Sequence, residues 1–543
     1  MWNVLLETAE RARTSLKLAK KSGLMWALRR EGAIELGRIL RSGSQNPALI
    51  YRMHAKNSPT KPAIHWHDKT ETWGELNERI DRIGAGLARR GIRRGKSVIL
   101  MMRNRPEFVE LGAAGARSGV AFISVSWRST SAELAYLANH SGAAGIFLEP
   151  ELMPIVERAR DELSEEFLRN VIPLGPAFES LLEDPTSAEE IDASGDSDAA
   201  VVVYTSGTTG KPKGAVRRFP KNTMLAAFRF INETPMRVDD VHLVACPLYH
   251  STAFGFLSLT HVLGGTVVLM DEFKPEAFLA LVEPHAVSTV AVVPTMLRRI
   301  LDLPESVRKK YDTRSLRAVF CGGAALSATL ATEFMDTFGD VLFNFYGATE
   351  TGLVTLAKPA DLRATPGTIG KALPGSRVRL LDEDKHDVGA GAVGELYVKS
   401  DLLVAGYHRD DDATRASMLE GFFSVGDLAR VDADGRYFIE GRKRDLIISG
   451  GVNIYPAEVE EAIQQHPKVA EAAVVGVPHR EWGESARAFV VRRAGALLDE
   501  GELKIYLRDR LSGPKVPQSI VFLDSLPRNP TGKVLKRELR ERD

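Results

Sequence analysis

Eleven residues, from Tyr204 to Gly214, have the composition of a loop that grips phosphate groups. Their sequence, YTSGTTGKPKG, holds three glycines, four serine or threonine hydroxyls and two lysines. Glycines let the backbone approach an anion closely, while N–H groups, hydroxyls and ammonium groups neutralise its charge. A flexible linker is the alternative, but a linker rarely has two lysines directly after an apolar run such as DAAVVVY. We therefore predict that this loop binds polyphosphate.

This loop differs from the P-loop of nucleoside triphosphatases. The P-loop has four residues between its glycines, whereas two residues separate Gly207 from Gly210 and Lys211 precedes a proline. The candidate phosphate-binding residues are Thr205, Ser206, Gly207, Thr208, Thr209, Gly210, Lys211 and Lys213.

Six later segments carry further groups that suit a nucleotide and an acid. They are PLYHSTAF (247–254), CGGAALS (321–327), YGATETG (346–352), SVGDLAR (424–430), GRKRDLIISGGVNIYPAEVE (441–460) and PRNPTGKVLKREL (527–539). Taken alone, each has a less specific interpretation: His250 is then a core histidine, and Asp427 a capping residue in a turn. Their order along one chain makes them informative.

Together these segments resemble the motifs of the adenylate-forming superfamily, which includes acyl-CoA synthetases, luciferases and the adenylation domains of peptide synthetases. The resemblance covers residues 47–540, and it is greatest to bacterial-type fatty acyl-CoA synthetases. It implies an acid–thiol ligase that uses ATP, Mg²⁺ and coenzyme A. Such an enzyme joins a carboxylic acid to AMP, releases pyrophosphate, and then passes the acyl group to CoA.

The resemblance also implies roles for four catalytic residues. Lys533 contacts the α-phosphate and the carboxylate, Thr349 contacts the α-phosphate, and Glu350 binds Mg²⁺. His250 forms a wall of the carboxylate pocket. The Mg²⁺ assignment fits the chemistry of this hard cation, which takes oxygen ligands and usually only one or two protein carboxylates.

The remaining implied residues surround the nucleotide and the thiol. Tyr346 stacks on adenine, Asp427 accepts hydrogen bonds from the ribose hydroxyls, and Arg442 lies near the ribose. Gly450 and Gly451 line the pantetheine tunnel, where a side chain would obstruct a narrow path. The other implied nucleotide-site residues are Gly322, Gly323, Ala324 and Gly347.

One site must serve both half-reactions, and the superfamily solves this by rotating a small C-terminal domain about a hinge. The hinge residue is usually lysine or aspartate, whereas this chain has Arg444 at the matching position. We expect Arg444 to be the hinge.

The elements that must position these residues are alternating strands and helices. Short apolar runs such as KSVILMM, TVVLMD, VSTVAVVP and LRAVFCGG alternate with helical patterns such as PEFVELGAAGARSG and TETWGELNERIDRIGAGLARRG. This alternation predicts an α/β fold with mixed sheets covered by helices. We expect a large ATP- and acyl-binding domain over residues 47–442 and a small, mobile α+β domain over 443–543.

The composition narrows the class of protein further. The chain has 543 residues, with 71 basic and 71 acidic side chains, so no overall charge favours nucleic acid. It has two cysteines, which form neither a disulfide framework nor a metal cluster, and we expect a cytoplasmic protein. The uncharged stretch Ser251–Met270 includes polar residues and a Gly-Gly pair, which favours a buried helix, a turn and a strand over a membrane span.

Residues 1–46 form a basic, partly amphipathic extension. They contain nine Lys or Arg and four Glu, a net charge of +5, and Met25, Leu28, Leu36, Ile39 and Leu40 share one side of a helical wheel. Such a helix can lie on an anionic membrane, which would place the protein peripherally on its inner face. We favour the alternative, which is a helix packed on its own domain with solvated charges.

The residues beside the expected carboxylate pocket bear on the substrate. An amino acid is disfavoured because no aspartate stands near Tyr249–His250, and apolar residues around Phe254 are consistent with a medium- to long-chain fatty acid. Aryl or other acids, and a ligase that loads a carrier protein, are the alternatives. A non-catalytic lipid-binding protein is disfavoured because Lys533, Glu350 and Asp427 are all present.

Overall fold

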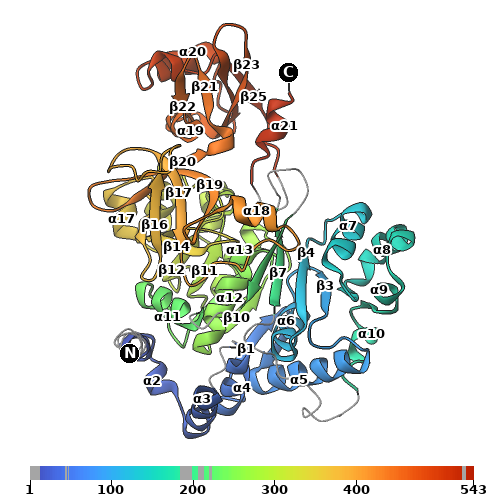
Figure 1. Cartoon of the computed structure of the whole chain (residues 1–543). Coiled ribbons are helices and arrows are strands. Elements are labelled where there is room, and N and C mark those ends of the chain that lie inside the picture. The colour runs from blue at the N-terminus through green and yellow to red at the C-terminus, as the bar shows by residue number, and fades with distance from the viewer. Residues whose placement is uncertain are drawn as a thin grey trace.

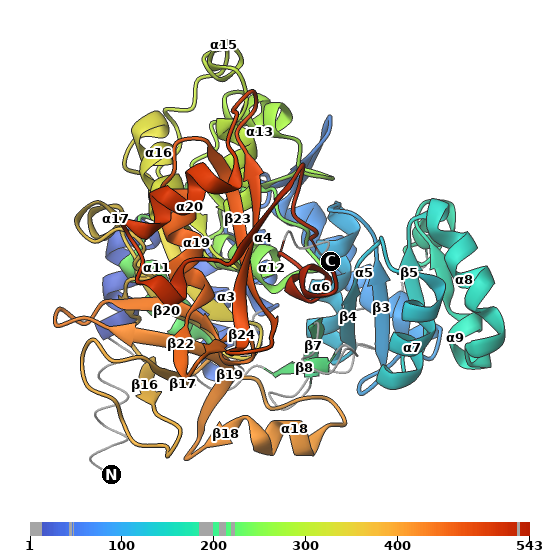
Figure 2. The same ribbon diagram turned by 90° about the horizontal axis from the view of Figure 1, so that it is seen from above.

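The structure is a computed structural model. It describes residues 13–42, 46, 48–183, 199–205, 213–218, 223–528 and 533–542. It confirms the predicted α/β class, with a large body followed by a small C-terminal one (Figure 1). Seen from above, the small body covers the centre of the large one, over α12, while α7, α8 and α9 lie to one side (Figure 2).

A nine-stranded sheet forms one half of the large body, in the order β15-β14-β13-β12-β11-β9-β10-β1-β2. The run from β13 to β1 is parallel, and antiparallel strands flank it on both sides. Its strands are β1 (Pro62–Trp66), β2 (Lys69–Thr72), β9 (Val241–Val244), β10 (Thr266–Leu269), β11 (Thr289–Val292), β12 (Ala318–Cys321), β13 (Leu342–Ala348), β14 (Gly352–Ala357) and β15 (Lys371–Ala372). Strands β10, β11 and β12 are buried throughout, as their apolar runs predicted.

A six-stranded sheet forms the other half, in the order β6-β5-β3-β4-β7-β8. It is parallel except for β8, which pairs with β7 in antiparallel fashion. Its strands are β3 (Ser97–Met101), β4 (Ala121–Val125), β5 (Ile146–Leu148), β6 (Val171–Pro173), β7 (Ala199–Thr205) and β8 (Lys213–Arg218).

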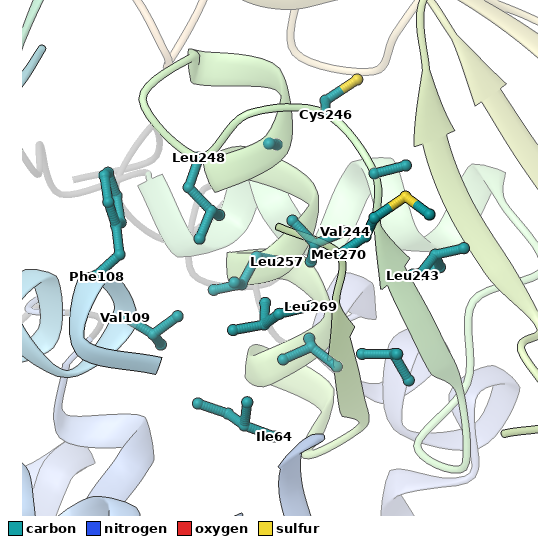
Figure 3. Close-up of a cluster of buried hydrophobic side chains, with 14 of the residues drawn as sticks. Ile64, Phe108, Val109, Leu243, Val244, Cys246, Leu248, Leu257, Leu269 and Met270 are labelled. Atoms are coloured by element: carbon teal, nitrogen blue, oxygen red, sulfur yellow. The ribbon is translucent and has the colours of Figure 1, made fainter. Parts of the chain in front are cut away.

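Helices fill the space between and around these sheets. Two of them, α5 (Trp73–Arg89) and α6 (Pro106–Ser118), contribute to the largest apolar core together with α12 (Ser251–Leu263). Figure 3 shows Phe108 and Val109 of α6 beside Leu257 of α12 and the strand residues Leu243 and Leu269. The other large-body helices are α4 (Leu49–Asn57), α7 (Ser131–Ser141), α8 (Met153–Ala159), α9 (Glu165–Arg169), α10 (Pro176–Glu179), α11 (Thr223–Glu233), α13 (Pro275–Val282), α14 (Pro294–Leu301), α15 (Glu305–Arg308), α16 (Ala328–Phe338), α17 (Pro359–Ala364) and α18 (Asp411–Ala416).

Helix α5 begins three residues later than its sequence pattern predicted. Residues 70–72 belong to strand β2, and Thr72 is the N-cap. The Thr72 hydroxyl accepts a hydrogen bond from the Glu75 N–H, and the Glu75 carboxylate accepts one from the Thr72 N–H. This reciprocal capping box satisfies two otherwise unpaired donors and fixes the start of the helix.

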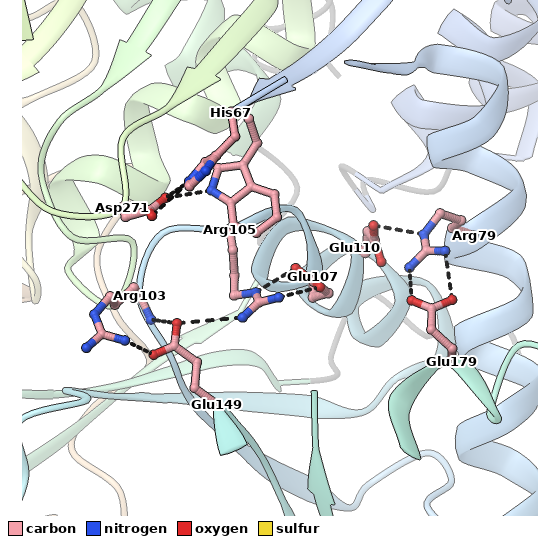
Figure 4. A network of polar contacts seen from close by, with 10 residues as sticks. His67, Arg79, Arg103, Arg105, Glu107, Glu110, Glu149, Glu179 and Asp271 are labelled. Carbon is pink, nitrogen blue, oxygen red and sulfur yellow. Dashed lines mark hydrogen bonds and ion pairs between the residues drawn. The ribbon is translucent and has the colours of Figure 1, made fainter. Parts of the chain in front are cut away.

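Charged groups tie α5 to its neighbours. Arg79 on α5 donates to Glu110 of α6 at 2.9 Å and to Glu179 of α10 at 3.0 Å (Figure 4). Burial, together with the charge of Glu110, raises the pKa of the neighbouring Glu71 to about 8. Arg79 therefore compensates a cluster of buried carboxylates that would otherwise repel one another.

The uncharged stretch Ser251–Met270 is a helix, a turn and a strand, as predicted. Helix α12 ends at Leu263, Gly264 takes a positive φ of 72°, and β10 follows. Only glycine adopts such a backbone at little cost, which explains Gly264, and a Cβ on Gly265 would lie 2.8 Å from the Asp240 carbonyl oxygen. Within the described residues, no helix has the length and apolarity needed to cross a bilayer.

Two smaller sheets complete the chain. The first contains β16 (Arg377–Leu381), β17 (Gly394–Lys399), β18 (Met418–Leu419), β19 (Phe422–Val431) and β20 (Tyr437–Arg442). The second, in the small body, contains β21 (Ile447–Ser449), β22 (Val452–Ile454), β23 (Val469–His479), β24 (Gly483–Arg492) and β25 (Ser519–Leu523), with helices α19 (Pro456–Gln464), α20 (Glu500–Arg508) and α21 (Lys536–Arg540). The expected domain boundary at 442/443 falls between these two sheets.

The extension packs on its own domain through residues 13–22, α2 (Leu24–Ala27) and α3 (Arg30–Ser42). Leu18 is buried beside α11 and α12, and the Asn57 side chain accepts a hydrogen bond from the Arg29 N–H at 2.7 Å. The helix is not continuous: Leu28 and Arg29 are non-helical, so the predicted apolar stripe does not share one face.

Candidate functional site

One cavity of about 1340 Å³ joins the predicted segments. It lies where the two large sheets and the small body meet. Residues from distant parts of the sequence that line it are Gly323, Gly347, His250, Thr349, Glu350, Arg442 and Lys533. The fold therefore brings all four residues expected to be catalytic, and three of those expected at the nucleotide, to one place.

Tyr346, Asp427 and Arg442 form a polar group at the edge of this cavity. The Tyr346 hydroxyl donates to Asp427 Oδ2 at 2.6 Å, and Arg442 Nε lies 2.8 Å from Asp427 Oδ1. Burial and the negative charge of Asp427 raise the pKa of Tyr346. Asp427 lies inside strand β19 opposite Arg442 of β20, not in a turn as its sequence context suggested. Both carboxylate oxygens are thus oriented by protein groups.

Two of the expected glycines are required by close packing. A Cβ added to Gly347 would lie 2.1 Å from the Gly352 carbonyl oxygen, across the β13–β14 turn. A Cβ on Gly322 would lie 2.5 Å from the Phe345 ring. Ala324 is exposed beside these positions. There is therefore no room for a side chain at Gly322 or Gly347.

Thr349 and Glu350 directly follow strand β13 and line the cavity. The Thr349 hydroxyl lies 3.3 Å from that of Ser251, the first residue of α12. Glu350 is 7% exposed, and its Oε1 accepts a hydrogen bond from the Tyr407 hydroxyl at 3.1 Å. No cluster of three metal-binding side chains occurs in the described part of the chain. A single buried carboxylate fits Mg²⁺, which takes its other oxygens from phosphates and water.

His250 occupies the N-cap position of α12, but its side chain accepts no hydrogen bond from the N–H groups of the helix. Its Nε2 is buried and has no hydrogen-bond partner among the residues that the structure describes. Burial lowers the pKa of His250 to about 4, so the ring is neutral at physiological pH. The core histidine His242 likewise has no partner for its Nε2 among the described residues. What distinguishes His250 from His242 is that it lines the cavity, where its Nε2 can bond to a ligand.

Lys533 reaches the cavity from the small body. Its side chain is open to the cavity, while protein atoms surround its other sides. This crowding and the positive charge of Arg442 lower the pKa of Lys533 to about 8. Asp427 and Asp445 act in the opposite direction. An anion arriving in the cavity would restore the ammonium form.

The Gly450–Gly451 pair does not line the cavity. It forms the exposed turn between β21 and β22, with φ angles of 55° and 81°. Arg444 lies on a short 3₁₀ turn, Lys443–Asp445, that connects the two bodies. The flanking residues are anchored on opposite sides: Lys443 pairs with Glu395 of β17 and Asp445 with Arg540 of α21.

Most of the predicted phosphate loop, from Ser206 to Lys211, lies outside the described residues. Its ends are placed: Thr205 is the last residue of β7 and pairs with Lys213, the first residue of β8. The structure adds two residues that lie outside all of these motifs: Tyr407, which contacts Glu350, and Glu471, which pairs with Arg528 beside the cavity. It also shows that Ser251 contacts Thr349, which belongs to a different motif. Only the fold brings these residues together.

The chain matches two families along its length. Residues 51–408 match the AMP-binding enzyme family, and residues 458–533 match the AMP-binding enzyme C-terminal domain. The two matches fall in the large and small bodies of the structure.

Similar proteins act on several acids. A feruloyl-CoA synthase from Amycolatopsis is 36% identical over 90% of this chain and 97% of its own. A fatty acid–[acyl-carrier-protein] ligase, ScoC, from Streptomyces coeruleorubidus is 33% identical over 90% of this chain and 95% of its own. A medium/long-chain fatty acid–CoA ligase, FadD8, from Mycobacterium tuberculosis is 31% identical over 97% of this chain and 94% of its own.

A solved structure shows the same fold with a reaction intermediate. The o-succinylbenzoate CoA synthetase MenE from Bacillus subtilis, in complex with the acyl-adenylate OSB-AMP, superposes with a TM-score of 0.80. It is 29% identical, and the match covers 91% of this chain and 98% of that one. The chain therefore belongs to the AMP-binding enzyme family, the adenylate-forming acid–thiol ligases that use ATP, Mg²⁺ and CoA.

Proposed function

We propose that this enzyme converts a medium- to long-chain fatty acid to acyl-AMP and then to acyl-CoA. The observation that carries the proposal is the cavity, which joins the cluster around Lys533 and Thr349 to an apolar region along α12. That region is long, and apolar walls favour an alkyl chain over a charged or strongly polar acid.

In the first half-reaction, a carboxylate oxygen attacks the α-phosphorus of ATP and pyrophosphate leaves. Both reactants are anions, so the site must supply positive charge and alignment. Lys533 and Arg442 supply fixed charge, and Thr349 would orient the α-phosphate. Glu350 would hold Mg²⁺, which offsets phosphate charge when bound. Neutral His250 would border the carboxylate and donate or accept a hydrogen bond without adding charge.

In the second half-reaction, the CoA thiol attacks the acyl carbon and AMP leaves. Lys533 occupies the cavity while the Gly450–Gly451 turn lies outside it. This arrangement supports assignment to the first half-reaction. The second would require the small body to rotate about Arg444 so that the Gly-Gly turn replaces Lys533.

The similarity to FadD8 supports a fatty acid. The match to FadD8 covers 97% of this chain of 543 residues, so it must include part of the extension, residues 1–46. The matches to ScoC and the feruloyl-CoA synthase cover 90%.

An aryl acid is the second candidate, since the feruloyl-CoA synthase is 36% identical. A carrier-protein thiol is a further alternative to CoA, as the ScoC similarity suggests.

We also propose that the protein is cytoplasmic and contacts a membrane peripherally through its extension, whose Trp26 is 82% exposed.

An acid panel in ATP–pyrophosphate exchange, with and without CoA, tests the proposal. We expect exchange with straight-chain acids of about ten carbons or more, and thioester formation with free CoA. If only aryl acids support exchange, the substrate is an aryl acid and the proposed fatty acid is wrong. Exchange without any CoA thioester, but with transfer to a carrier protein, would favour the carrier ligase.

A further inference from the structure

Within the cavity, one branch runs between α4, α6 and α12. Helix α6 contributes Val109, Gly112, Ala113 and Ala116, which are spaced i, i+3, i+4 and i+7 and so share one face. Helix α12 faces them with Phe254: a Cβ on Gly112 would lie 3.5 Å from the Phe254 ring. Small side chains on α6 thus leave the space that the branch occupies.

The wall of this branch carries no charge. Ser258 donates its hydroxyl to the Phe254 carbonyl oxygen at 2.7 Å, so this polar side chain is already bonded. At the far end, the Tyr51 hydroxyl and His261 Nδ1 lie 3.1 Å apart. Burial lowers the pKa of His261 to about 3, which keeps the ring neutral. The branch would therefore bind an alkyl group, since it offers neither a charge nor a cluster of free donors.

The length of the branch follows from α12. Ser251 marks the reacting end through its contact with Thr349, and His261 lies ten positions further along the helix. At a rise of about 1.5 Å per residue, these positions are about 15 Å apart. A chain carbon advances by no more than one C–C bond of about 1.5 Å, so at least about ten carbons fit.

We propose that the acyl chain lies in this branch, and that Gly112 and Ala116 on α6 determine the chain length accepted. This inference rests on the proposed fatty acid activity and adds the route of the chain and the residues that limit it. Ala116 lies four positions beyond Gly112, about 6 Å deeper along α6, where its carbonyl accepts a hydrogen bond from Asn46. A block at Ala116 should thus admit about four more carbons than a block at Gly112.

Two leucine substitutions test the proposal. Gly112→Leu and Ala116→Leu add apolar bulk to the face of α6 that lines the branch, and leucine is a strong helix former. We expect Gly112→Leu to lose tenfold or more in kcat/KM for tetradecanoate relative to hexanoate, the order expected when a pocket cannot take added methylenes. Ala116→Leu should shift the preferred length less, leaving an optimum about four carbons longer than that of Gly112→Leu.

Ala227→Leu is the matched control, because Ala227 lines the cavity from α11 on the other side of α12. It should keep the wild-type length profile, and thermal unfolding should show that all three variants fold. Unchanged profiles in both α6 variants, or the same shift in the Ala227 variant, would overturn the proposed route. If wild-type enzyme activates aryl acids but no straight-chain acid, the fatty acid function itself fails, which this series separates from a wrong route.

Discussion

At the residue scale, the site depends on how neighbours set the charge of a few side chains. Burial, together with the positive charge of Arg442, lowers the pKa of Lys533 to about 8, and burial keeps His250 neutral. Fixed positive charge is useful only where negative charge develops, which is at the α-phosphate. The positive charge of the site is thus compensated only when the negatively charged nucleotide binds.

We predict that Lys533→Ala cripples acyl-AMP formation but spares the conversion of preformed acyl-AMP to acyl-CoA. Loss of one transition-state contact should lower the exchange rate roughly 10²–10³-fold. Pyrophosphate exchange and single-turnover thioester formation measure the two steps. Lys536→Ala is the control, because Lys536 pairs with Glu460 at 2.6 Å and does not line the cavity. An equal loss in both half-reactions would refute the assignment of Lys533.

His242 provides a prediction on stability. It is fully buried on β9, beside Thr289, and burial lowers the pKa of His242 to about 3. The unfolded chain binds this proton below about pH 6.5, whereas the folded chain does so only near pH 3. Stability is therefore lost as the pH falls from about 6.5, by about 1.4 kcal/mol per unit. His242→Gln should show a correspondingly shallower pH dependence in urea unfolding between pH 6 and 4.5. Identical slopes in the two proteins would contradict this linkage.

At the element scale, the connection between the two bodies is the most informative feature. Lys443 is held by the large body and Asp445 by the small one, so Arg444 is the residue between two anchors. A rotation of the small body has to be absorbed near this position. The sequence resemblance indicated the same residue, although arginine is unusual there.

We predict that Arg444→Pro retains pyrophosphate exchange and loses CoA transfer. Proline holds φ near −65°, which would keep the small body in the arrangement with Lys533 in the cavity. Arg444→Ala should keep both activities, and thermal unfolding reports whether either variant is destabilised. CoA transfer by the proline variant would exclude a hinge at Arg444. Loss of both half-reactions with a lowered melting temperature would show local misfolding instead.

Strands and helices with a clear apolar pattern could be predicted from the sequence, but the residues at which they begin and end could not. The buried strands β10, β11 and β12 and the helix α12 match their apolar runs. The start of α5 moved to Trp73 because the Thr72–Glu75 capping box overrode the preceding pattern. Taken alone, Asp427 suggested a capping residue in a turn, but pairing between β19 and β20 places it in a strand. Contacts such as Tyr407 to Glu350 had no local signal, because they arise only from tertiary packing.

At the scale of the whole molecule, the small C-terminal body and the N-terminal extension lie far apart. The small body lies at one end, and α2, α3 and α4 lie at the opposite end (Figure 1). Residues 13–42 expose large apolar side chains at Leu16, Met25, Trp26, Ile34 and Leu40. The exposed cations of this segment are Arg13, Lys17, Lys20, Lys21, Arg29, Arg30, Arg38 and Arg41. A membrane at this end would leave the small body free to rotate.

We predict that the extension binds anionic vesicles. Trp26 and Leu40 are 82% and 72% exposed, so Trp26→Ser with Leu40→Ser should weaken vesicle co-sedimentation and leave pyrophosphate exchange unchanged. Binding should also weaken with added salt, because the Debye length shortens to about 3 Å at 1 M. Leu497→Ser is the control, since Leu497 is 87% exposed on the small body. Undiminished binding by the double variant would argue against this surface.

The central claim is that a carboxylate attacks the α-phosphate in this cavity, and an isotope measurement tests it most directly. Dodecanoate carrying ¹⁸O in both carboxylate oxygens is converted with ATP and CoA, and the products are weighed by mass spectrometry. The account predicts one ¹⁸O in AMP and one in the thioester carbonyl, with none in pyrophosphate, because the attacking oxygen stays on phosphorus when the thiol displaces AMP. Unlabelled AMP, or label in an inorganic phosphate product, would contradict it.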